Sequence, residues 1–354
     1  MGFRIKKSVK AGKGVRVNVG KSGVGLSFGT RGLRHTSHSS GRRTNSVGLP
    51  GTGLYYTKSA TKKSASHPTS SRQQKSLQAQ DNQWIVEEFN QYIDRITHLH
   101  KKPLQPINWK EVQALPAPFP PAEIGPQEQK ALKAYQQFSP NPFQRLFKSL
   151  ADKKRQQLKQ TIATAKKEDA ESYNSWEKQH HQASRVLDGD DDVFLEVIEQ
   201  EHAFSDLAKW GDHFQFIVND THIPTVTFMI KADDVLPEKR LSITKTGRVS
   251  KRKMTKTDYY AIKQDYVCSC AIYAARNILA LLPVDRVVVN VLEDRLNTAT
   301  GHQKDTVILS VMFEQSIMDT LNLSNIDPSD AMENFDHRMD NLKTKGFRAV
   351  DRIV

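Results

Sequence analysis

The chain has 354 residues, two cysteines and a formal net charge of +13, from 52 Lys and Arg against 39 Asp and Glu. This length predicts about two domains with a sizeable core, and two cysteines exclude a disulfide framework. The longest apolar region, residues 271–292, is interrupted by charged residues and by Pro283, so we expect no membrane-spanning helix. Because the chain does not open on the apolar core of a signal peptide, we expect a cytoplasmic protein.

The positive charge is concentrated at the start of the chain. Residues 1–80 contain 16 Lys and Arg and no Asp or Glu. Such a segment predicts binding to a polyanion, which could be nucleic acid, an anionic cell-surface polymer or an acidic protein. A solvated basic face that aids solubility is the alternative. The candidate contacts here are Arg16, Lys21, Arg31, Arg34, Arg42 and Arg43.

Residues 14–34, GVRVNVGKSGVGLSFGTRGLR, contain the tail of a phosphate-binding loop, Gly20-Lys21-Ser22. That loop requires glycine at position 15, where Val15 stands. The dinucleotide-binding pattern requires glycine at position 28, where Phe28 stands. Neither nucleotide-binding loop is therefore present.

Apolar and polar residues instead alternate in this region, which is typical of half-buried strands. The alternation predicts strands at 15–19, 24–28, 47–49 and 54–57, separated by glycine-containing turns. We therefore predict a small antiparallel sheet within residues 1–57.

The segments MGFRIKKSVKAGKGVRVNVGKSGVGLSFGTRGLR and GLPGTGLYY resemble the N-terminal module called domain of unknown function 4236. The resemblance covers about residues 1–57. It implies a small β module in a bacterial protein, and it implies no catalytic residue.

Residues 58–80 are polar and predict a flexible linker. The following region, 81–185, is predicted to be helical, with an apolar face between residues 84 and 99. A proline-rich connector at 115–126 precedes a long polar helix from about residue 143 to residue 187. We expect the lysines of this helix on a solvated face, balanced locally by Glu168, Asp169 and Glu171.

Residues 186–354 predict one α+β domain with a sheet of four to five strands, so the whole chain is expected to be α+β. The expected elements are a helix at 193–207, strands at 214–218, 223–230 and 241–244, a helix at 266–282, strands at 287–292 and 306–313, and a last helix capped by Asp327 and Pro328.

This order of elements resembles the restriction-endonuclease core, whose enzymes hold Mg²⁺ with acids on two neighbouring strands. Asp220 is the candidate for the first acid, and Glu238 and Lys245 stand near the third strand at the wrong spacing. A magnesium-dependent nuclease, or an inactive relative of one, is therefore an alternative function.

Three further patterns predict structure and no metal or cofactor. Cys268 and Cys270 would diverge on a helix, so we expect buried thiols. His180 and His181 lack a second ligand pair and predict surface histidines. The acidic run 188–192 lacks the twelfth-position Glu of a calcium loop, and we expect it to break the long helix and begin the next one.

A second basic segment, 239–256, carries eight Lys or Arg and no acid. It is expected to project as a loop that contacts phosphates, with a flexible charged loop as the alternative. Its candidate contacts are Lys251, Arg252 and Lys253. The leading hypothesis is a protein that binds a polyanion, most plausibly nucleic acid. A structural adaptor that docks a protein partner is a further alternative.

Overall fold

The computed structural model describes residues 7–12, 15–20, 23–28, 33–39, 43–48, 55–60, 71–102, 104–140, 148–218 and 223–353. The chain forms two compact units, one made of residues 1–105 with 198–354 and the other of residues 106–197. The first unit joins distant parts of the chain, because the helix at Ser71–Thr97 packs against the C-terminal part. In the part of the chain that the structure describes, no helix has the length and apolarity needed to cross a bilayer.

The N-terminal residues form an antiparallel sheet whose strands neighbour one another in chain order. These strands are β1 (Lys7–Gly12), β2 (Val15–Gly20), β3 (Gly23–Phe28), β4 (Leu33–His38), β5 (Arg43–Gly48) and β6 (Tyr55–Ala60). All four predicted strands are confirmed, and β1 and β4 are additional. Those two strands are mostly polar, so they lack the alternation from which strands are predicted. The turns at 21–22, 29–32 and 49–54 lie outside the described residues.

Helix α1 (Ser71–Thr97) carries the predicted apolar face on its second half. Its side chains at Ile85, Phe89, Tyr92 and Ile96 are almost completely buried. The Tyr92 hydroxyl donates a hydrogen bond of 2.7 Å to the carbonyl of Val235, which ties α1 to the C-terminal fold. Because α1 begins at residue 71, the expected linker is already helical over its last ten residues.

The C-terminal sheet has five strands in the order β13-β12-β11-β8-β7. Strands β8 and β11 are parallel, and every other neighbouring pair is antiparallel. The strands are β7 (Gly211–Val218), β8 (Pro224–Ile230), β11 (Arg286–Leu296), β12 (Gln303–Glu314) and β13 (Asp336–Met339).

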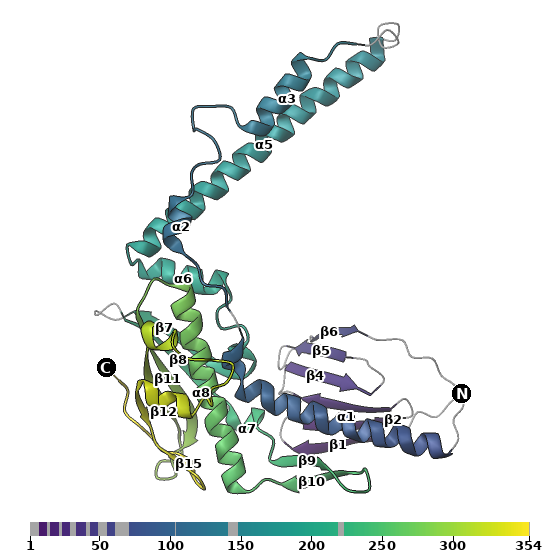
Figure 1. The fold of residues 1–354 in the computed structure, drawn as a ribbon, viewed down its shortest axis with the longest axis vertical. Helices are drawn as coiled ribbons and strands as arrows, with labels where there is room; N and C mark the ends of the chain where they lie inside the picture. Colours follow the sequence, from purple (N-terminus) through teal and green to yellow (C-terminus); the bar gives the residue numbers. More distant parts are fainter. Residues whose placement is uncertain are drawn as a thin grey trace. The chain divides into compact units, whose positions relative to one another are not determined.

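Helix α8 (Lys256–Leu281) makes the crossover from β8 to β11 and runs across the sheet (Figure 1). It is buried along most of its length from Tyr266 onward, including Ile272 and Ile278, and this apolar length confirms the helix predicted at 266–282. The remaining short elements are η1 (Leu99–Lys101), η2 (Leu207–Lys209), α7 (Ala232–Val235), α9 (Gln315–Met318), η3 (Asp330–Asn334), β14 (Asn341–Leu342) and β15 (Gly346–Phe347).

Three predictions for this region need correction. The helix expected at 193–207 ends at Gln200, and the separate 3₁₀ turn η2 stands at Leu207. The strand expected at 241–244 is present at Lys239–Ile243, but it is not part of the sheet, because its only described partner is a second basic strand with which it forms a separate hairpin. The last helix is only the 3₁₀ turn η3. The Asp327 carboxylate does accept hydrogen bonds from the backbone N–H of Ser329 and of Asp330, as a cap would. The chain then leaves the turn to pair as β13 with the edge strand β12.

The second unit consists of α2 (Trp109–Ala114), α3 (Pro126–Gln136), the 40-residue α5 (Lys148–Leu187) and the start of α6 (Asp191–Gln200). Both α2 and α3 pack along α5 (Figure 1). The long helix is thus confirmed, although its expected first residues lie outside the described part. The break is also confirmed, because a turn at Asp188 and Gly189 ends α5 and two aspartates begin α6.

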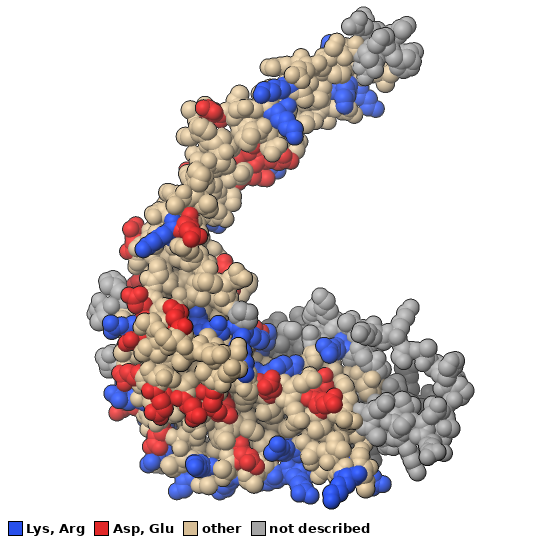
Figure 2. Space-filling view, viewed as in Figure 1, with Lys and Arg blue, Asp and Glu red and all other residues tan. Residues whose placement is uncertain are grey.

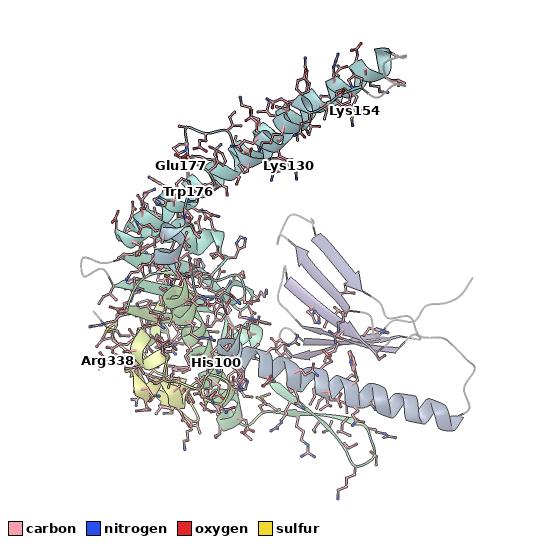
Figure 3. All side chains as sticks on the ribbon, turned by 45° about the horizontal axis from the view of Figure 1, so that its top comes forward. His100, Lys130, Lys154, Trp176, Glu177 and Arg338 are labelled. Carbon is pink, nitrogen blue, oxygen red and sulfur yellow. The ribbon has the colours of Figure 1, made fainter. Side chains whose placement is uncertain are left out.

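The proline-rich connector lies against α5 through aromatic side chains. The indole Nε1 of Trp176 donates to the carbonyl of Leu115 at 2.8 Å, and the Tyr173 ring lies 5.4 Å from the Phe119 ring. Figure 3 labels Trp176 beside Glu177 on α5. These contacts hold a segment without regular structure on the surface of the helix.

Asp169 was expected to balance the exposed lysines of α5, but it is a buried residue of that helix. Its side chain is only 5% exposed. One carboxylate oxygen accepts from the backbone N–H of Gln127 at 3.2 Å and the other from Glu128 at 2.8 Å. Asp169 therefore caps the N-terminus of α3 from a neighbouring helix, while Glu171 does pair with Lys167 on the surface as expected.

Candidate nucleic-acid interface

The basic segment 239–256 contains a two-stranded antiparallel hairpin, β9 (Lys239–Ile243) and β10 (Val249–Lys253). Its turn is closed by two hydrogen bonds, from the N–H of Gly247 to the carbonyl of Thr244 and from the N–H of Thr244 to the carbonyl of Arg248. Gly247 has φ +73°, a conformation that glycine adopts without steric cost. The segment expected to be a projecting loop is therefore an ordered hairpin.

One face of the hairpin is directed toward the protein. By register, Leu241 shares this face with Lys239, Ile243 and the partners of all three on β10. Leu241 is only 3% exposed, and β9 and β10 both contact α1. The Asn82 side chain on α1 donates to the carbonyl of Gly247 at 2.8 Å, which holds the turn. We call this the inner face, and the opposite face, formed by Arg240, Ser242, Ser250 and Arg252, the outer face.

Positive charges oppose one another across the hairpin. Arg252 is paired with Arg240 on the outer face, and Lys253 is paired with Lys239 on the inner face. Like charges directly opposite each other in a sheet destabilise it, by roughly 0.2–1 kcal/mol for each pair. Within the described residues, no acidic side chain forms an ion pair with any basic residue of 239–256. The hairpin thus presents cations with no internal counter-charge, and Figure 2 shows blue atoms along the lower edge of the view, where Figure 1 draws β9 and β10.

The three predicted contacts on β10, Lys251, Arg252 and Lys253, are all exposed. The structure brings them together with the basic residues of β9. Partial burial, and second the positive charge of Lys239, lower the pKa of Lys251. A bound anion would oppose both effects, because it favours the protonated amine.

The predicted contacts of the N-terminal sheet are not all on one face. Position 16 pairs with Ser27, which pairs with Thr36, so positions 16 and 34 lie on the same face. Arg43 pairs with position 37 and therefore lies on the opposite face, where it is exposed. Lys21, Arg31 and Arg42 lie outside the described residues.

The residues considered for a nuclease site do not come together. Asp220 lies outside the described residues. Glu238 precedes β9 and Lys245 lies beyond its other end, so the whole five-residue strand, roughly 17 Å long, stands between them. In the described ranges, no three His, Cys, Asp or Glu side chains are grouped so that they could hold a metal ion.

The cysteines are buried, as expected. Both thiols are completely inaccessible, and the Cys268 sulfur lies 3.7 Å from the sulfur of Met339. Burial raises the pKa of Cys268 well above its usual value, so the thiol stays protonated and unreactive. His181 is exposed, and the half-buried His180 ring lies 5.2 Å from the ring of Trp176.

His100, labelled in Figure 3, is a buried polar residue that sequence reasoning missed. Its Nδ1 lies 2.9 Å from the hydroxyl of Ser269 on α8, and Arg276 donates to its carbonyl. Its Nε2 is buried without a hydrogen-bond partner. Burial, and then neighbouring positive groups led by His98, lower the pKa of His100 to about 4. This neutral imidazole joins η1 to α8. The only feature of the sequence that pointed to its burial was its position next to the apolar face of α1.

The charges in the interior contrast with those of the hairpin. Lys263 on α8 donates to Glu293 on β11, and both side chains are largely buried. Arg295 also donates to Glu293, at 2.8 Å, and to the carbonyl of Phe347, at 2.8 Å. The cations of this cluster therefore share the Glu293 carboxylate, whereas the hairpin carries cations alone.

Comparison with known proteins gives a match to a family model. Residues 3–57, which contain the N-terminal sheet up to β6, match the family described as "Protein of unknown function (DUF4236)". No curated protein and no solved structure matches the chain. The family match covers neither the hairpin nor the C-terminal sheet.

Proposed function

We propose that this chain binds a polyanion, with nucleic acid as the ligand, through the β9–β10 hairpin and the basic N-terminal sheet. The observation that carries the proposal is the set of unpaired cations on an ordered hairpin, including two cross-strand pairs of like charge. A row of phosphates would supply the missing counter-charge and relieve the repulsion between the strands. The two free cysteines are consistent with a cytoplasmic protein, where thiols stay reduced.

The alternatives have less support. A nuclease needs clustered acids, and Glu238 and Lys245 stand apart on the hairpin. An adaptor that docks a protein partner would favour a continuous exposed apolar patch. Three of the exposed large apolar side chains in the C-terminal fold, Ile217, Ile243 and Leu296, come from three different strands.

The test is a salt titration of the full chain with labelled single-stranded and double-stranded DNA and RNA. With about four to six phosphate contacts, the slope of log K against log salt for duplex DNA is expected near −3 to −5. Replacing Lys251, Arg252 and Lys253 by Gln should flatten this slope by about 2 to 3, because each lost cation releases one counterion fewer.

The matched control replaces three exposed lysines of α5, Lys153, Lys154 and Lys159, by Gln. It changes the net charge equally and should leave the slope almost unchanged. If no nucleic acid binds at low salt, the proposal fails and the adaptor takes its place. If the control flattens the slope as much as the hairpin variant does, binding is non-specific and the hairpin is not the site.

A further inference from the structure

We propose that the β9–β10 hairpin enters the major groove of duplex DNA as a two-stranded ribbon, with its outer face toward the ligand. This inference rests on the proposed function and specifies the partner and the contacting residues.

The dimensions of the hairpin fit this groove. Each strand has five residues, which span about 17 Å, and the two strands are about 4.8 Å apart. The major groove of B-form DNA is about 12 Å wide and admits a two-stranded ribbon with its side chains. The major groove of duplex RNA is deep and narrow and does not, so the geometry selects DNA.

The outer face has the chemistry for reading a groove. It consists of two arginines and two serines, and Arg240, Arg252 and Ser242 are all exposed. Arginine donates two parallel hydrogen bonds to a phosphate or to O6 and N7 of guanine, and serine contacts either kind of group. No carboxylate lies on this face to repel the DNA backbone.

The inner face anchors the hairpin to the rest of the chain. Leu241 is buried and the turn is held by Asn82, so the chain anchors the hairpin through this face, while its lysines stay exposed. The open end is closed by a hydrogen bond of 3.0 Å from the N–H of Met254 to the carbonyl of Glu238. A ribbon fixed at both ends presents its outer face without an ordering cost on binding.

The hairpin lacks what single-stranded ligands require. Proteins that hold single strands stack the bases on aromatic side chains. Residues 238–258 contain no Phe, Tyr, Trp or His. The hairpin therefore suits a duplex, whose bases are already stacked on one another.

The experiment compares two matched double variants of the full chain. Arg240→Gln/Arg252→Gln removes the cross-strand pair of the outer face, and Lys239→Gln/Lys253→Gln removes the same charge from the inner face. The probes are a 20-base-pair DNA duplex, an RNA duplex of the same sequence and one DNA strand alone, all at the same salt concentration. Circular dichroism checks that both variants are folded, which we expect because each loses a repulsive pair.

We expect the DNA duplex to bind at least about tenfold more tightly than the other two probes. The arginine variant should lose about 10- to 100-fold in affinity for it, and the lysine variant, which removes phosphate contacts alone, should lose less. Wild-type protein should also protect guanine N7, which lies in the major groove, from methylation by dimethyl sulfate, and the arginine variant should not.

Three results would overturn the groove model while leaving polyanion binding intact: equal losses in the two variants, equal or tighter binding of RNA or of the single strand, or DNA binding without protection of guanine N7. Absence of binding to any probe at low salt would instead remove the proposed function itself.

Discussion

The buried cap of α3 gives a sharp test of the second unit. Asp169 on α5 is 5% exposed and accepts hydrogen bonds from the backbone N–H groups of Gln127 and Glu128. Gly125, which precedes the helix as its N-cap, has no side chain to make this cap itself. We predict that Asp169→Asn frees the N-terminus of α3 while leaving α5 helical.

The expected cost follows from these contacts. An amide keeps one acceptor oxygen, but its NH₂ group faces the second backbone N–H, so one charge-assisted hydrogen bond of about 1.5–3 kcal/mol is lost. The loss of the negative charge at the helix N-terminus adds about 0.3–1 kcal/mol. We expect the free energy of opening α3 to fall by about 2–3 kcal/mol, which corresponds to roughly 30- to 150-fold faster amide exchange.

Hydrogen exchange measured by mass spectrometry on the full chain reports this quantity for residues 129–136 of α3. The matched control is Glu171→Gln, an exposed acid on the same helix that pairs with Lys167 at 3.6 Å. It should change exchange in α3 by less than about twofold, because exposed pairs contribute little. Unchanged exchange in α3 of Asp169→Asn, or the same acceleration in both variants, would refute this reasoning.

A second substitution tests the same contact from the other side. A Cβ added at Gly125 would lie 2.3 Å from the Asp169 Cγ, far inside van der Waals contact. Gly125→Ala should therefore displace the carboxylate and accelerate exchange in α3 as Asp169→Asn does.

Three further outcomes are expected in the C-terminal fold. Phe228→Ala, which removes a completely buried ring, should lower the free energy of unfolding in urea by about 3–5 kcal/mol. Glu293→Leu should lower the free energy of unfolding by about 3–5 kcal/mol, because it leaves buried Lys263 without its carboxylate. Adding Lys263→Met to this variant should recover most of the lost stability. A double variant as unstable as Glu293→Leu alone would contradict the pairing. Burial, and then the charge of Asp327, raise the pKa of Asp265 to about 6. The protonated acid therefore stabilises the fold below the pKa of the unfolded chain, and this stability is lost as pH rises through 6. Asp265→Asn should therefore be more stable than the wild type by about 1 kcal/mol at pH 7.5 and equal to it near pH 4, as measured by urea unfolding at each pH; a gain that does not depend on pH would contradict the assignment.

The sequence determined the elements whose pattern is local. Alternation over a few residues predicted β2 and β3, the spacing of apolar residues predicted α1, and the length of an apolar run predicted α8. The run of eight cations in 239–256 also identified the candidate interface, since charge is a property of composition. These predictions needed no knowledge of which segments meet in space.

Only the tertiary structure decided which residues contact one another. The basic segment is a hairpin with an inner and an outer face because its two strands pair with each other and Leu241 is buried. The number of charges in a segment does not reveal which residues are paired across two strands. His100 meets Ser269 across 169 residues of sequence, and Asp169 caps a helix that begins more than 40 residues earlier. A polar residue is buried or solvated according to the element that packs on it, and that element is set by chain topology, so no local pattern distinguishes Asp169 from Glu171.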